Sequence, residues 1–149
     1  MKEAHLLDKL NLTFGANPRP KTLLEMSDET RRRYAKEVDA LETMDWENGH
    51  PDDLDAFYEP NTFLSITGYK YLIPKVFAFC QKWPMVNKDI VDVMKRTPFV
   101  SDADTFVERF WGDERWLLWQ FLEEMHKLTG DDIFEDFGEE ATLLQIKLM

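Results

Sequence analysis

The chain has 149 residues, with 44% hydrophobic and 13% aromatic side chains, and a net charge of −11. Its length suits one domain, over residues 1–149, and its apolar content excludes a wholly disordered chain. One cysteine excludes a disulfide framework and a multi-cysteine metal site, and the acidic balance argues against binding to nucleic-acid phosphates.

Helical spacing of apolar residues begins at the N-terminus. A first helix is predicted over residues 3–12, before a Gly- and Pro-rich segment interrupts the pattern. Ser27 can cap a second helix that runs to about Met44, with two acids in its first turn. The basic residues of this helix are interpreted as a solvated face, on which Arg33 pairs with Glu37.

An acidic turn follows the second helix. Residues 48–51 form the turn, and Asp52, Asp53 and Asp55 are interpreted as the acidic first turn of a short helix. A calcium loop is disfavoured, because Tyr58 stands where such a loop needs glycine.

The most apolar part of the chain covers residues 62–79. Ser65 can cap a helix there, and the apolar residues have helical spacing, although the aromatic content also fits a buried strand. Because Pro74 lacks an N–H and clashes with the preceding turn, we expect two helical pieces with a break or kink near Ile73. Cys80 is expected to be a buried or half-buried structural thiol.

The pattern continues beyond Trp83-Pro84. Asn87 can cap a helix over residues 88–97, which Pro98 is expected to stop. Ser101 can cap the next helix, which is predicted to contain the apolar residues between 106 and 111.

The clearest helix covers residues 114–129, with Gly130 as its C′ residue, and a terminal helix is predicted from Glu139 after a hinge or cap at Gly138. The spacing predicts five buried core residues: Leu72, Phe77, Leu118, Leu122 and Met125. Core packing is favoured over an exposed interface for three tryptophans: Trp111, Trp116 and Trp119. The whole pattern predicts an all-α, single compact domain of about six to eight helices.

One segment carries a resemblance to a known family. It reads Phe63-Leu64-Ser65-Ile66-Thr67-Gly68-Tyr69-Lys70-Tyr71-Leu72-Ile73-Pro74, with Trp46 upstream and Trp119-Gln120-Phe121-Leu122 downstream. Residues 27–128 thereby resemble a bacterial domain family of unknown function that carries Phe-Leu-Ser/Thr-x-x-x-Phe/Tyr-x-Tyr-Leu-x-Pro. Ile73 and the tryptophan-rich residues 111–119 depart from the family pattern. The resemblance implies a mostly helical domain and no activity.

No targeting or membrane segment is expected. The N-terminus lacks the apolar run of about 7–15 residues that a secretory signal needs. The apolar residues 69–79 are interrupted by charge and proline and fall short of the roughly 20 that span a bilayer. We therefore expect a cytoplasmic protein without membrane contact.

The charge is uneven along the chain. Residues 101–149 hold 13 of the 29 acids but only 4 of the 18 bases, and residues 39–59 hold eight acids and no base. Solubility alone accounts for such surfaces, but they also suit steering toward a basic protein. The first hypothesis is an acidic inhibitor, immunity or antagonist protein, without catalytic residues or cofactor. Four acids after Gly130 are predicted to bind the partner: Asp131, Asp132, Glu135 and Asp136.

The alternative hypothesis is an enzyme with a carboxylate–histidine metal site. Glu123 and His126 have the i, i+3 spacing of half a di-iron motif, which needs a second such pair. Glu47 and His50 share the spacing, but they are predicted to lie on a turn. A scaffold or chaperone-like accessory role stays open as a third class.

Overall fold

A computed structural model describes residues 2–15, 18–21, 23, 24, 27–55, 57, 64–83, 89–100 and 103–149. These residues form nine α-helices, six of them at least seven residues long, and one 3₁₀ helix, η1. They include no strand beyond an isolated bridge between Leu24 and Leu64. The all-α prediction is confirmed, and the strand alternative for the apolar segment is wrong over its described residues.

The helices are α1 (Lys2–Phe14), α2 (Asp28–Arg33), α3 (Ala35–Glu42), η1 (Pro51–Leu54), α4 (Ile66–Lys82), α5 (Asp89–Val100), α6 (Ala103–Glu108), α7 (Asp113–Leu128), α8 (Ile133–Phe137) and α9 (Glu139–Leu148).

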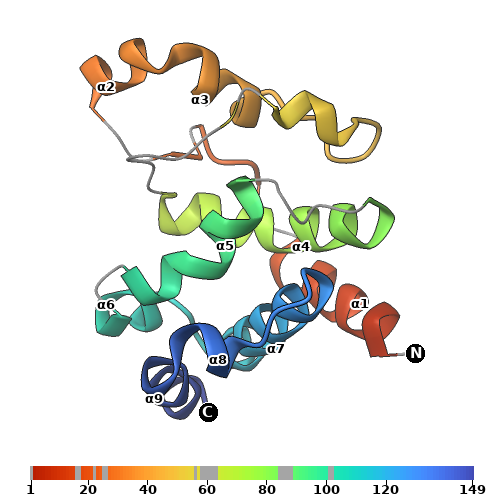
Figure 1. The fold of residues 1–149 in the computed structure, drawn as a ribbon, viewed down its shortest axis with the longest axis vertical. Coiled ribbons are helices and arrows are strands. Elements are labelled where there is room, and N and C mark those ends of the chain that lie inside the picture. The colour runs from red at the N-terminus through yellow and green to blue at the C-terminus, as the bar shows by residue number, and fades with distance from the viewer. Residues whose placement is uncertain are drawn as a thin grey trace.

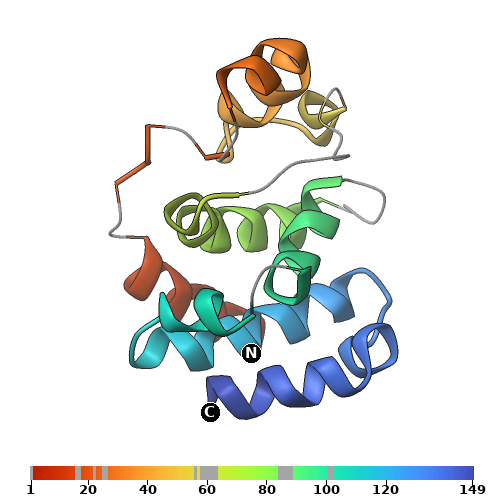
Figure 2. The same ribbon diagram turned by 90° about the vertical axis from the view of Figure 1, so that its left-hand side faces the viewer.

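Three helices form the centre of the molecule, because α1, α4 and α7 contact one another pairwise. Helices α2 and α3 and η1 lie beyond α4 at one end, and α8 and α9 lie beyond α7 at the other (Figures 1 and 2). Helix α5 contacts α4, α7 and α9, and α8 packs on α7 and α9. The C-terminal end of α7 is therefore the place where α5 and α8 come together.

The predicted core is confirmed. Five residues from α4 and α7 are 0% exposed: Leu72, Phe77, Leu118, Leu122 and Met125. The apolar stripe of α7 ends there, since Leu128 is 38% exposed. Cys80 is half-buried, and burial raises the pKa of its thiol to about 12, which keeps it protonated as a structural residue.

The predicted helix ends are confirmed at several positions. The hydroxyls of Ser27 and Ser65 accept hydrogen bonds from the N–H three residues on, at 3.2 and 2.9 Å. Gly130 and Gly138 adopt positive φ angles of 78° and 54°, a region in which glycine is favoured. His50 lies on the predicted turn, where its side chain caps η1.

The single helix predicted from Ser27 to Met44 is wrong. The chain breaks at Tyr34 (φ −113°, ψ 32°) into α2 and α3. Arg31 and Glu42 are 3.8 Å apart, although one straight helix would separate them by about 16 Å along its axis. Glu42 then accepts hydrogen bonds from the N–H groups of Leu23 and Leu24, and Arg31 donates to the Leu24 carbonyl.

The ion pair predicted within that helix also differs. Arg33 lies 3.8 Å from Glu29, on the N-terminal side, instead of pairing with Glu37. Because the break at Tyr34 separates Arg33 from Glu37, the two no longer share one continuous helical face.

The stop expected at Pro98 and the helix break expected at Pro74 are also wrong. Helix α4 continues through Pro74 and α5 through Pro98, and both prolines are buried. Pro98 cannot donate to the carbonyl of Met94, one turn earlier. The Tyr69 hydroxyl donates to that carbonyl instead, at 2.6 Å, so a side chain of α4 replaces the missing bond of α5. Tertiary contacts offset the usual cost of an internal proline.

The prediction that all three tryptophans are core residues is wrong for two. Trp119 is 0% exposed, but Trp111 and Trp116 are 66% and 44% exposed. Trp116 lies two residues from buried Leu118, about 160° away around the helix axis. Trp111 lies in the connection after α6, which ends earlier than predicted, at Glu108.

One short helix, α8, was not predicted, because its five residues are too few to show a period. Five residues named above lie outside the described residues: Tyr58, Phe63, Pro84, Asn87 and Ser101.

Candidate functional site

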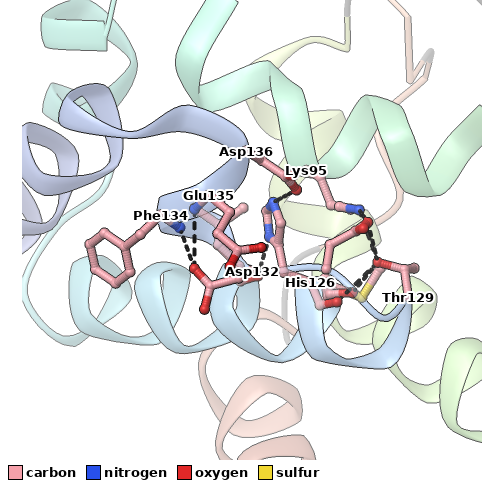
Figure 3. Close-up of polar contacts among 10 residues, drawn as sticks. Lys95, His126, Thr129, Asp132, Phe134, Glu135 and Asp136 are labelled. Atoms are coloured by element: carbon pink, nitrogen blue, oxygen red, sulfur yellow. Dashed lines mark hydrogen bonds and ion pairs between the residues drawn. The ribbon is translucent and has the colours of Figure 1, made fainter.

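The four acids predicted to bind a partner lie where the chain passes from α7 into α8. Figure 3 shows Asp132, Glu135 and Asp136 in this region. The N–H groups of Gly130 and Asp131 donate to carbonyls of the last turn of α7, at 3.1 and 2.7 Å, in a Schellman cap. Asp132 follows directly, and Glu135 and Asp136 lie on α8. All four acidic residues are exposed.

Asp131 is bound to the body of the molecule. Its Oδ2 accepts hydrogen bonds from the Lys95 ammonium at 2.7 Å and from the Thr129 hydroxyl at 3.1 Å. Lys95 is 7% exposed and also donates to the Thr129 hydroxyl, at 2.9 Å. The hydrogen bond and charge of Lys95 lower the pKa of Asp131, so this ion pair links α5 to the α7–α8 turn at neutral pH.

His126 lies beneath this turn and is 1% exposed (Figure 3). Its Nδ1 lies 2.8 Å from the Leu122 carbonyl, which only accepts, so Nδ1 carries a proton. Nε2 makes no hydrogen bond within the described structure, although Asp136 Oδ2 is 3.4 Å away. Burial lowers the pKa of His126, and the positive charge of Lys95 lowers it further. The hydrogen bond to the Leu122 carbonyl and the carboxylates of Asp136 and Asp131 act in the opposite direction, but the net shift is downward. A neutral imidazole at pH 7 follows.

Asp132 caps α8, since its Oδ1 accepts from the N–H groups of Phe134 and Glu135 at 2.8 and 3.2 Å. Asp131 and Asp132 therefore bind groups within this chain, whereas Asp136 lies 3.4 Å from the neutral His126 ring without a hydrogen bond to it. Glu135 differs, because within the described residues no hydrogen bond or ion pair involves its side chain. Among the predicted acids, Glu135 has the side chain with no ion pair or hydrogen bond in the described residues, and it is exposed.

A cavity of about 410 Å³ opens beside His126. Its lining combines three carboxylates, two cations, the imidazole and one phenyl ring: Asp92, Lys95, Arg96, His126, Asp131, Asp136 and Phe137. Phe137 stacks on Phe99 at 3.8 Å between ring centroids and packs edge-on to His126 at 5.9 Å. This aromatic wall and the Lys95–Asp131 pair make the cavity a structural junction of α5, α7 and α8.

Glu123 and His126 line separate cavities. Glu123 faces a space of about 640 Å³ between α1 and α7, together with His5 and Trp116. His126 faces the cavity beside α5 and α8. The part of the chain that the structure describes contains no group of three His, Cys, Asp or Glu residues able to hold a metal ion. Within the described residues, Glu123 and His126 therefore have no third side chain with which to form a metal site.

The exposed residues of α8 and α9 include acids and apolar side chains. We name five of them the α8–α9 face: Phe134, Glu135, Glu139, Leu143 and Ile146. Phe134 is 40%, Leu143 52% and Ile146 65% exposed. Leu143 also lines a cavity with Pro98 and Phe99 of α5, whereas Phe134 packs on Trp119. On α9, residues 139, 143 and 146 have the i, i+4, i+7 spacing of one helical stripe.

Sequence reasoning missed these apolar residues. The available signal was that α9 carries apolar residues on two faces, because Ala141, Leu144 and Leu148 form its buried side. It also missed the Lys95–Asp131 pair, whose members are 36 residues apart.

No family model, curated protein or solved structure matches this chain. The resemblance through residues 63–74 accordingly stays a prediction. Among the described helices, none combines the length and the apolar character needed to cross a membrane.

Proposed function

We propose that this chain is a protein-binding domain that engages a basic protein partner, as an inhibitor, immunity or antagonist protein does. The observation that carries the proposal is the α8–α9 face, where exposed apolar side chains stand among acids. Residues 128–146 contain six acids and no lysine or arginine. An apolar centre with a charged rim is the usual anatomy of a protein interface.

Phe134 is the best-placed anchor of the α8–α9 face. Its ring is 40% exposed, yet it packs on the buried indole of Trp119 at 5.8 Å between ring centroids. The N–H of Phe134 is held by the Asp132 cap. A partly exposed aromatic ring with a fixed position loses little conformational entropy on binding, which favours such residues at the centre of interfaces.

The acids of the region have different roles in this proposal. Asp131 and Asp132 hold the α7–α8 turn, while Glu135 and Glu139 contact the partner. Acids around the anchor steer a basic surface toward it and raise the association rate more than the final affinity. Association is therefore expected to slow as salt rises, because exposed charges are screened beyond about 8 Å at physiological ionic strength.

The experiment compares three immobilised proteins: the wild type, Glu135→Lys/Glu139→Lys, and the control Asp39→Lys/Glu47→Lys. Both double variants change the net charge equally, and the control residues are exposed acids on and after α3. A lysate of the source organism is passed over each, and the retained proteins are purified and tested individually. We expect a basic protein that binds the wild type and the control but not the face variant.

Three results count against the proposal. One is a purified partner that binds the face variant as well as the wild type. Another is an equal loss of binding in the control variant, which would show that the net charge and not the α8–α9 face determines binding. The third is an association rate that does not change with salt.

A further inference from the structure

Another cavity, of about 350 Å³, is lined by residues 18–20 and by residues at the starts of α4 and α7. None of the residues that define the α8–α9 face lines it. Four charged side chains line it: Arg19, Lys70, Arg109 and Glu114. Three of the four are cations, although the whole chain has a net charge of −11. Trp111 forms part of the same lining. The cavity thus has a local charge opposite to that of the protein.

Trp111 is held firmly although its side chain is 66% exposed. The Lys70 ammonium stacks over its ring at 4.1 Å from the centroid, and Lys70 itself is 6% exposed. Glu114 Oε1 accepts hydrogen bonds from the backbone N–H of Trp111 at 2.9 Å and from the Lys70 ammonium at 3.0 Å. Glu114 thus holds the backbone of Trp111, and Lys70 contacts its indole beside the cavity.

The two arginines supply the unbalanced charge. Glu114 offsets Lys70, but within the described residues no ion pair involves Arg19 or Arg109, and both are exposed. Guanidinium groups bind phosphate and carboxylate oxygens through paired hydrogen bonds. Long-range repulsion by the acidic surface is screened beyond about 8 Å at physiological ionic strength, so these nearby arginines decide which charge the cavity accepts.

We propose that this cavity binds a small ligand in which a planar aromatic ring carries a phosphate or carboxylate group. The ring stacks on Trp111, and the anionic group contacts Arg19 and Arg109. The volume lies near the lower end of the range of about 300–1,000 Å³ found for ligand pockets, which fits one small molecule. This site is independent of the proposed binding to a basic protein.

The experiment is isothermal titration calorimetry with the full chain. The probes are adenosine monophosphate and indole-3-acetate, which distinguish phosphate from carboxylate as the anionic group. Adenosine and inorganic phosphate represent the two halves of the first probe. Each probe is titrated into the wild type, Trp111→Ala and Arg19→Gln/Arg109→Gln. The control protein is Trp116→Ala. Trp116 is also an exposed tryptophan, but it lines the separate cavity between α1 and α7.

We expect at least one complete probe to bind the wild type. Trp111→Ala and the double arginine variant should each weaken that binding by about tenfold or more, while Trp116→Ala changes it by less than about twofold. Adenosine and phosphate should each bind about tenfold more weakly than the nucleotide. Far-UV circular dichroism confirms the fold of each variant, and Arg19→Gln/Arg109→Gln tests the site without altering the contact between Lys70 and Trp111.

The proposal is overturned if neither complete probe binds the wild type. It is equally overturned if Trp116→Ala weakens binding as much as Trp111→Ala, or if the arginine variant binds like the wild type. A single-stranded oligonucleotide that binds far more tightly than the mononucleotide would assign the cavity to a nucleic-acid strand instead.

Discussion

The hydrogen bond between Tyr69 and the Met94 carbonyl offers a direct test of how α5 continues through a proline. Tyr69 is 0% exposed, and burial raises the pKa of its hydroxyl well above the ordinary value, so it remains a donor. The bond is 2.6 Å long and meets the carbonyl that Pro98 leaves without an N–H donor. Tyr69→Phe removes the hydroxyl but keeps the ring and its edge-on contacts with Phe106 and Phe110.

Tyr69→Phe is expected to lower the free energy of unfolding by about 1–3 kcal/mol, the cost of leaving a buried carbonyl unsatisfied. Pro98→Ala restores an N–H four residues after Met94. In that background the same Tyr69→Phe change should cost no more than about 1 kcal/mol, because the carbonyl has a second donor. The difference between the two costs measures the coupling of Tyr69 with Pro98.

The double-mutant cycle compares the wild type, Tyr69→Phe, Pro98→Ala and the double variant. Urea unfolding of each protein, monitored by circular dichroism, measures the four free energies of unfolding. Thermal unfolding should agree, with a shift of about 2–4 °C in the midpoint for each kcal/mol in a chain of this size. An equal cost of Tyr69→Phe in both backgrounds would refute the reasoning, since the hydroxyl would then not act through the carbonyl that Pro98 leaves free.

Three further predictions concern the core and the α7–α8 turn. Leu122→Ala should lower the free energy of unfolding by about 2–5 kcal/mol in urea titrations, and a much smaller loss would mean that the site is not tightly packed. Asp132→Ala should cost about 0.5–2 kcal/mol through loss of the α8 cap, whereas Glu135→Ala should change stability by less than about 0.5 kcal/mol; equal costs would contradict their assigned roles. Because the pKa of His126 is lower in the folded chain than in the unfolded one, the unfolded state takes up this proton first as pH falls. Stability should therefore be greatest above about pH 6.5 and decline below it, and His126→Phe should flatten that decline; an unchanged pH profile would show that His126 is not desolvated.

The helices that could be predicted from sequence are those whose apolar residues repeat over several turns. Helix α7 shows this best, since Leu118, Leu122 and Met125 are buried as their spacing predicts. Local capping chemistry was equally readable, because Ser65 and Gly130 act within a few residues of their own position. Both signals are short-range, so the chain alone contains them.

The errors at Pro98 and at the α2–α3 break arose where a distant residue changed a local preference. Pro98 stops a helix unless another donor reaches the freed carbonyl, and here Tyr69 of α4 supplies one. The α2–α3 break follows from contacts of Arg31 and Glu42 with residues 23 and 24. These contacts cannot be predicted from the spacing of residues along α2, α3, α4 or α5, because they join residues from different parts of the chain.

The sequence by itself determined the helical class, the core face of α7 and the uneven charge, because periodicity, capping and composition are properties of neighbouring residues. Tertiary structure alone decided which charged residues face one another. In the folded chain Asp131 binds Lys95, and Asp136 lies beside His126. Glu135 and Phe134 are exposed. The physical reason is that an ion pair or a cavity depends on the distance between side chains in space, and the packing of α5 and α8 on α7 fixes that distance.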